Sequence, residues 1–229
     1  ERYVKDKNAR QQIREGVDRV RGSDIIARQF AEDNGIKALG KLGKEDLDTF
    51  QQYLIAKRAI ELEGKGIKTG RDLNADNNLI QSVGDRYAPH EALIRNYSDK
   101  MLDYSVENGM ISKELADSLK RDNPDYVPMN RVMDEVEAGG FQKSKQLGSL
   151  SKQSVVQKIK GSEKTVDNPI ESLLKNTIRM VNEAERNKVA RALTSTDAFS
   201  ENALKEGAKP RAGYDTISLL DNGKKVTYE

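Results

Sequence analysis

The sequence predicts a mainly α-helical protein, an irregular helical bundle with one long helix in its C-terminal half and a small terminal β-hairpin. Apolar residues recur at intervals of three and four through most of the 229-residue chain, which is the period of an α-helix. Charged residues make up 33% of the chain and aromatic residues only 5%, which favours solvated helices around a small core. Near the end, Asp221-Asn222-Gly223 separates two short strand-like segments and predicts a hairpin.

The first 63 residues are predicted to form three helices. Residues 1–21 are basic, and their few apolar side chains form a narrow stripe suited to lying across another element. Ser23-Asp24 is expected to cap the second helix. Glycines then break the chain into turns before a third helix over residues 44–63. This helix has apolar residues on more than one side, which predicts a central position.

The middle of the chain is predicted to hold a polar loop over residues 67–78, followed by a helix that begins at Pro89 and ends near Glu107. Proline lacks a backbone N–H and is therefore favoured in the first turn of a helix. Ser112 is expected to cap a further short helix. The buried face of the Pro89 helix is predicted to contain Ile94, Tyr97, Met101 and Tyr104.

The segment from Lys120 to Arg131 is predicted to be an anchor that joins two helical lobes. Each of its prolines fixes its own φ and favours extended geometry in the residue before it, so the chain should turn and then run extended. An aromatic and an aliphatic side chain between the prolines are available for packing. The anchor residues are Pro124, Tyr126, Val127 and Pro128.

These features divide the chain into four parts. Residues 1–138 form a helical core with the basic helix and the anchor, and residues 139–167 form a linker rich in Lys, Gly and Ser. Residues 168–196 form the long helix, which Pro169 opens. Residues 197–229 begin a piece that contains the hairpin. A lone hairpin is marginal in water, so its sheet partners are expected beyond the last residue or in another chain.

Two segments resemble binding motifs without completing them. Residues 35–42 come within one residue of a phosphate-binding loop, but Leu42 stands where a hydroxyl is needed for Mg²⁺. Asp72, Asn74 and Asp76 have the opening spacing of a calcium-binding loop, but Val83 stands where a bidentate Glu is needed. A capped polar loop is the preferred interpretation of the second segment.

The amino-acid composition excludes several kinds of catalytic and metal site. The absence of Cys removes disulfides, thiolate metal sites and Cys nucleophiles, and the single histidine, His90, rules out a pair of His ligands. His90 is expected in the first turn of its helix, in a surface or capping role. No apolar run is long enough for a membrane span. We therefore expect no catalytic residues, no cofactor and no metal.

Basic residues could serve nucleic-acid binding in two places. The long helix is basic, but its spacing predicts internal ion pairs that use these charges: Glu171–Lys175, Arg179–Glu183 and Glu185–Lys188. The linker has few acidic residues between its lysines and is the better candidate for sequence-independent phosphate contacts. The candidate contact residues are Lys143, Lys145, Lys152, Lys158, Lys160 and Lys164.

Four strings together resemble a known group of proteins. They are YLIAKRAIELEGKGIKTGR, NPDYVPMNR, KGSEKTVDNPIESLLKNTIRMVNEAERNKVARAL and DNGKKVTYE, in this order. They are similar to helical modules of the very large multi-domain proteins of tailed bacteriophages and related mobile elements, called polyvalent proteins, and to some internal virion proteins. The resemblance implies a non-catalytic module, located in the virion or the bacterial host cytoplasm, beside enzymatic neighbours.

The expected function is that of a helical scaffold or interaction module, acting in virion assembly, DNA ejection or host takeover. Its expected partners are other domains of the parent chain or other protein subunits. The alternative is a module that contacts nucleic acid without sequence preference, through the linker lysines and the basic helices. An enzyme that uses Ser, Lys or carboxylates is a third class, for which no spacing in the sequence identifies a site.

Overall fold

The computed structural model describes residues 7–123, 169–196 and 216–228. The described part is mainly helical and ends in a two-stranded antiparallel hairpin, so the predicted fold class is confirmed. The elements in chain order are α1 (Lys7–Arg21), α2 (Ser23–Asp33), the 3₁₀ helix η1 (Ile36–Lys41), α3 (Lys44–Gly64), α4 (Leu73–Glu107), α5 (Lys113–Asp122), α7 (Pro169–Thr194), β1 (Ile217–Asp221) and β2 (Lys224–Tyr228).

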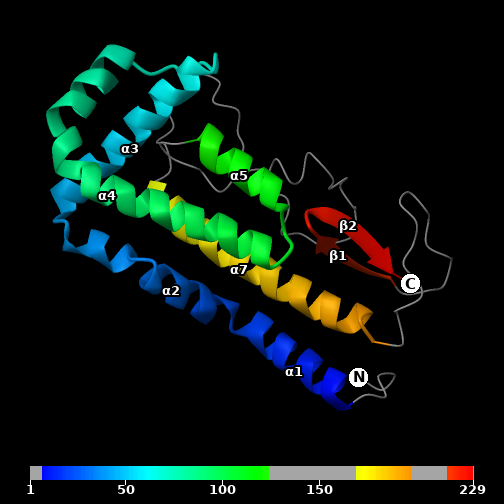
Figure 1. The fold of residues 1–229 in the computed structure, drawn as a ribbon. Coiled ribbons are helices and arrows are strands. Elements are labelled where there is room, and N and C mark those ends of the chain that lie inside the picture. The colour runs from blue at the N-terminus through cyan, green and yellow to red at the C-terminus, as the bar shows by residue number, and fades with distance from the viewer. Residues whose placement is uncertain (1–6, 124–168, 197–215, 229) are drawn as a thin grey trace.

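The N-terminal helices and the C-terminal hairpin all pack against helix α7. Helices α1 and α2 follow one another along one side of α7, α4 lies along another side, and the hairpin lies beside its C-terminal half (Figure 1). Gly16 lies against Val189 while Ser23 bonds to Asn182, so α1 and α2 run antiparallel to α7. Residues more than 150 positions apart in the sequence therefore meet along one helix.

Helix α4 differs most from the sequence-based prediction. The expected polar loop over residues 67–78 is wrong in its second half, because the helix begins at Leu73 and Asp72 caps it by accepting from two backbone N–H groups. Pro89 is not the first helical residue but lies inside the helix. The ring removes one backbone hydrogen bond, which bends a helix, and α4 changes direction in its N-terminal half (Figure 1). The bend carries the rest of α4 toward α7.

Of the two predicted serine caps, one is confirmed and one is wrong. Ser112 caps α5 as predicted, since its Oγ accepts from the Leu115 N–H at 3.2 Å. Ser23 does not cap α2. Gly22 occupies that position without a side-chain bond, and the buried Ser23 hydroxyl accepts from Asn182 Nδ2 at 2.8 Å. The predicted cap is therefore a contact between helices.

The core lies where α2, α3, α4 and α7 meet. Tyr97 is fully buried at its centre and its hydroxyl shares a 2.7 Å hydrogen bond with Thr177 of α7. Phe30 of α2 packs edge-on against Tyr97 and Tyr104, with ring centroids 5.7 and 5.6 Å apart. The predicted buried face of α4 is confirmed for Ile94, Tyr97 and Met101, while Tyr104 is partly buried. The aromatic contacts join α2 to α4, and the Tyr97 hydrogen bond joins α4 to α7.

The hairpin folds as the Asp-Asn-Gly signal predicts. Asn222 and Gly223 both have positive φ, at 49° and 79°, which suits a two-residue turn that matches strand twist. Two strands are marginal alone, yet Leu219 and Leu220 of β1 are both buried. In the described residues the support comes from α7, which β1 contacts directly, and not from a further strand.

The anchor residues Pro124, Tyr126, Val127 and Pro128 and the linker over residues 139–167 lie outside the described residues.

Candidate functional site: a polar junction on α7

The most elaborate polar site in the described structure is built on the C-terminal half of α7, and we call it the α7 junction. It is defined by Glu185, Asn187, Lys188 and Arg191, which reach α1, α4 and β1. The helical repeat turns Glu185 toward α1 and Asn187 toward the hairpin. One turn of helix therefore fastens two elements that are far apart in the sequence.

Glu185 is the centre of the junction. Its side chain has 0% solvent exposure, yet both carboxylate oxygens are fully engaged. Arg19 of α1 donates from Nε to Oε2 at 2.7 Å and from Nη2 to Oε1 at 3.0 Å, a bidentate pair. Lys188 Nζ donates to Oε1 at 2.8 Å, and the Tyr104 hydroxyl donates to the same oxygen at 3.1 Å. A buried charge needs such a set of partners to be tolerated.

The protonation states at the junction follow from these contacts. Burial by itself raises the pKa of Glu185, but the hydrogen bonds from Arg19 and Lys188 outweigh it and lower the pKa to about 2. Burial, with the adjacent negative charge of Glu185, raises the pKa of Tyr104 to about 12. The hydrogen bond to Glu185 raises the pKa of Arg19. At neutral pH Glu185 is therefore an anion.

Asn187 holds the hairpin in place. Its side-chain oxygen accepts from the Leu220 N–H at 2.7 Å, and its amide nitrogen donates to the Leu220 carbonyl at 2.9 Å. The same nitrogen donates to the carbonyl of Asn108, just after α4, at 2.9 Å. Asn187 thus pairs with β1 as a neighbouring strand would, and it links β1 to the end of α4.

Arg191 and two glycines complete the contact between the hairpin and the turn after α4. Arg191 Nη2 donates to the Leu220 carbonyl at 3.0 Å and to Asp221 Oδ1 at 2.9 Å. Gly109 has a φ of +67°, and a Cβ there would lie 2.0 Å from Arg191 Nη2. Its carbonyl accepts from the Gly223 N–H at 3.1 Å. The backbone angle at position 109 favours glycine, and a Cβ there would also displace the Arg191 guanidinium.

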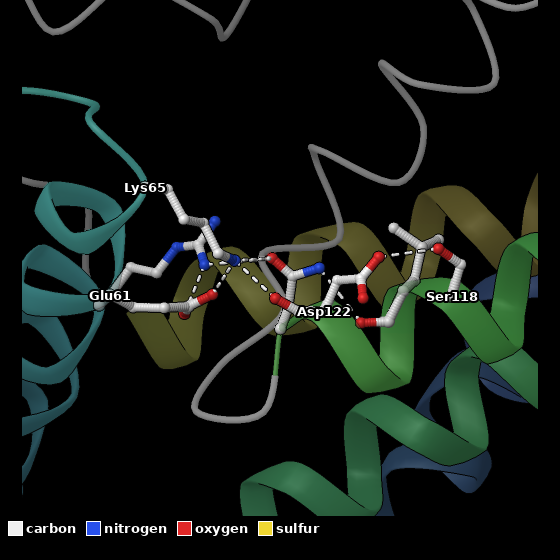
Figure 2. Close-up of polar contacts among 7 residues, drawn as sticks. Glu61, Lys65, Ser118 and Asp122 are labelled. Carbon is white, nitrogen blue, oxygen red and sulfur yellow. Dashed lines mark hydrogen bonds and ion pairs between the residues drawn. The ribbon is translucent and has the colours of Figure 1, made fainter.

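A second polar cluster joins the C-terminal ends of α3 and α5 (Figure 2). Lys65, at the end of α3, donates to the Asp122 carbonyl at 2.6 Å and also pairs with Glu61. Arg58 donates to Glu61 at 2.6 Å and to Asn123 Oδ1 at 3.3 Å. A cation at a helix C-terminus donates to free carbonyls and interacts favourably with the negative end of the helix dipole. The cluster therefore fixes the end of α5, which includes the first residues of the predicted anchor segment, Lys120–Asp122, in helical rather than extended form.

The near-motifs of the sequence serve the fold in the structure. Asp72 caps α4, and Asp76 receives a bidentate ion pair from Arg71, with the closest distance 2.6 Å. Both carboxylates of the calcium-like pattern are thus engaged. His90 does not lie in a first turn but inside α4, where its ring packs 5.8 Å from that of Phe50. Residues 36–41 of the phosphate-loop-like segment form η1.

Two of the charge pairs predicted for the long helix are confirmed. Glu171–Lys175 and Glu185–Lys188 are ion pairs, at 2.7 and 2.8 Å. Glu183 contacts Arg186, at 3.8 Å. The six candidate phosphate contacts, Lys143, Lys145, Lys152, Lys158, Lys160 and Lys164, lie outside the described residues.

The sequence predicts the Glu185–Lys188 pair of the junction but not its contacts with other elements, although one signal for a buried partner was present. Val181, Glu185 and Val189 follow one another at intervals of four, so the carboxylate interrupts the apolar stripe of α7. An acidic residue within such a stripe indicates a buried ion pair, whose partner the sequence alone does not name. For Asn187 no comparable signal exists, because its partners are backbone groups.

Searches for similar proteins gave no match to any family model, curated protein or solved structure. Within the described ranges, no cluster of His, Asp and Glu side chains is arranged to hold a metal ion. The helices in those ranges also include none with the length and apolar character that crossing a membrane requires.

Proposed function

We propose that this chain is a non-catalytic helical scaffold and interaction module of a larger protein. The observation that carries the proposal is the α7 junction, in which a fully buried carboxylate and a buried amide bind neighbouring helices and the hairpin. The Glu185 carboxylate accepts hydrogen bonds from Arg19, Lys188 and Tyr104, and the Asn187 amide bonds to backbone groups. The junction joins α1, α4, α7 and the hairpin into one rigid support.

The electrostatics favour this role over acid–base chemistry. A general base must exchange a proton near the working pH. The pKa of about 2 for Glu185 and of about 12 for Tyr104 leaves neither group able to do so at neutral pH. Both groups instead keep one charge state over a wide pH range, which suits a permanent fastening.

The proposed setting rests on the resemblance of the four sequence strings to modules of phage and mobile-element proteins. In that setting the module acts in virion assembly, DNA ejection or host takeover, in the virion or the host cytoplasm. Its partners are other domains of the parent chain or other protein subunits.

The alternative function is sequence-independent contact with nucleic acid. The observation that favours it is the accumulation of six lysines between residues 143 and 164 with few intervening acidic residues. The net charge of +2 gives the whole chain little long-range attraction for a polyanion. The scaffold is therefore the primary proposal.

A titration with a short DNA duplex over a range of salt concentrations tests both functions. For a scaffold we expect negligible affinity at physiological salt. Phosphate contacts by six lysines would give a logarithmic salt slope of about −5, since each neutralised phosphate contributes about −0.9. The matched control replaces the six lysines by Gln. Measurable affinity with that slope, lost in the Gln variant, would contradict the scaffold proposal and support the alternative.

A further inference from the structure

The two edges of the hairpin differ in what they offer to a partner. Residues in an antiparallel pair alternate between those that bond to the opposite strand and those whose N–H and C=O point away. Asp221 and Lys224 flank the two-residue turn and bond to each other, so Leu220 and Lys225 point outward, followed by Ser218 and Thr227. The contacts of Leu220 with Asn187 agree with this register.

The edge of β1 is closed at Leu220, whereas the edge of β2 is open within the described part of the chain. The Leu220 N–H donates to Asn187, and the Leu220 carbonyl accepts from Arg191. On β2, the outward backbone groups of Lys225 and Thr227 have no hydrogen-bond partner in the described part of the chain. Because β1 is fixed to α7, β2 is held in place, and among the described residues its outer edge is free to pair with a further strand.

The charge of this edge indicates what it binds. Lys224 and Lys225 are exposed and lie on opposite faces of β2. Neither has an ion pair in the described structure, whereas Lys57, Lys65 and Lys188 each contact a carboxylate. Two adjacent unpaired cations on both faces of an open edge are complementary to a strand that carries carboxylates on both of its faces.

We propose that β2 binds an extended acidic segment of a partner protein as a third, edge-added strand. Main-chain bonds to Lys225 and Thr227 supply the pairing, and Lys224 and Lys225 select for acidic side chains. This inference rests on the proposed interaction function and names its partner class. A second copy of the chain is disfavoured as the occupant, because lysines on an edge strand repel an identical edge.

The test uses the full chain and two blocked peptides of eight residues, one repeating Glu-Glu-Val-Val and the other repeating Lys-Lys-Val-Val, so that each carries its charges on both faces of a strand. Calorimetry measures binding, and backbone amide shifts locate it. We expect the acidic peptide to bind at least about tenfold more tightly than the basic one. We also expect its binding to weaken as salt rises and the largest shifts to occur at Lys225 and Thr227.

A proline substitution tests the strand pairing itself. Thr227→Pro removes an outward N–H without removing a bond between β1 and β2, which an edge strand tolerates. We expect binding to fall about tenfold or more. Thr227→Ala is the matched control, since both variants lose the 2.9 Å hydroxyl contact with Ser218 but only Pro loses the N–H. Lys225→Pro with Lys225→Ala provides a second pair should Thr227→Pro fail to fold.

Three results would overturn the inference: equal binding of the two peptides, binding that both proline variants retain, or absence of binding. Concentration-dependent dimerisation that the proline variants abolish would also overturn it, by assigning the edge to a second copy. These results leave the scaffold proposal standing, because the DNA titration tests that proposal separately.

Discussion

Replacing Glu185 by Gln removes the charge at the centre of the α7 junction while nearly preserving its shape. The carboxyl has a pKa of about 2 in the folded protein against an ordinary value of 4.5. At about 1.4 kcal/mol for each pH unit, this difference corresponds to about 3 kcal/mol of stability at neutral pH. We therefore expect Glu185→Gln to lower the free energy of unfolding by about 3 kcal/mol at pH 7.

The stabilising contribution of Glu185 should also decrease as the pH falls, which can be measured. The folded pKa lies below the unfolded one, so the contribution of Glu185 is complete above about pH 5.5 and declines as the pH falls toward 2. Urea unfolding, followed by helical circular dichroism at pH 7, 4 and 2.5, measures it. The difference between wild type and Glu185→Gln should shrink steadily with pH, since the other carboxylates are common to both proteins.

Glu183→Gln is the matched control, two residues away on the same helix. Glu183 and its partner Arg186 have side chains that are 43% and 46% exposed and lie 3.8 Å apart. Such surface pairs contribute less than about 1 kcal/mol. Equal losses in the two variants, or a loss at Glu185 that does not change with pH, would refute the reasoning from a buried ion pair.

Three further changes test the packing around α7, each by the same unfolding measurement. Gly16→Ala should destabilise the protein by about 1 kcal/mol, since its Cβ would lie 2.8 Å from Val189 Cγ2. In a Val189→Ala background the same change should stabilise it, because only the higher helix propensity of Ala remains. Destabilisation in both backgrounds would contradict the steric cause. Gly109→Ala should cost about 2 kcal/mol, from its positive φ and the displacement of Arg191, and a neutral effect would contradict the close approach. Asn187→Asp should destabilise the hairpin, because it loses the amide donor to Leu220 but keeps the acceptor, and unchanged stability would contradict this role.

Much of the fold could be predicted from local chemistry. The hairpin follows from the Asp-Asn-Gly turn, and the start of α5 follows from Ser112, because each depends on residues adjacent in the chain. Pro89 shows where local rules fail. A proline favours a first turn on average, but here the surrounding packing accommodates a bent continuous helix, a tertiary effect that propensity does not contain.

The junction was less accessible to prediction because its partners are distant. Arg19 and Glu185 are 166 positions apart, and no spacing rule connects two residues on different helices. The interruption of the apolar stripe at Glu185 could have indicated that a buried partner exists. The role of Asn187 depends on the backbone of Leu220, whose availability follows only from the register of the hairpin.

Amide hydrogen exchange at Leu220 tests most directly the central claim that α7 fastens the hairpin into a rigid support. Leu220, Lys225 and Thr227 all point away from the opposite strand, so hairpin pairing alone protects none of them. Only Leu220 donates to Asn187. We expect slow exchange at Leu220 and fast exchange at Lys225 and Thr227 in the free protein, with the protection at Leu220 lost in Asn187→Ala. Exchange at Leu220 as fast as at the other two amides would contradict the account.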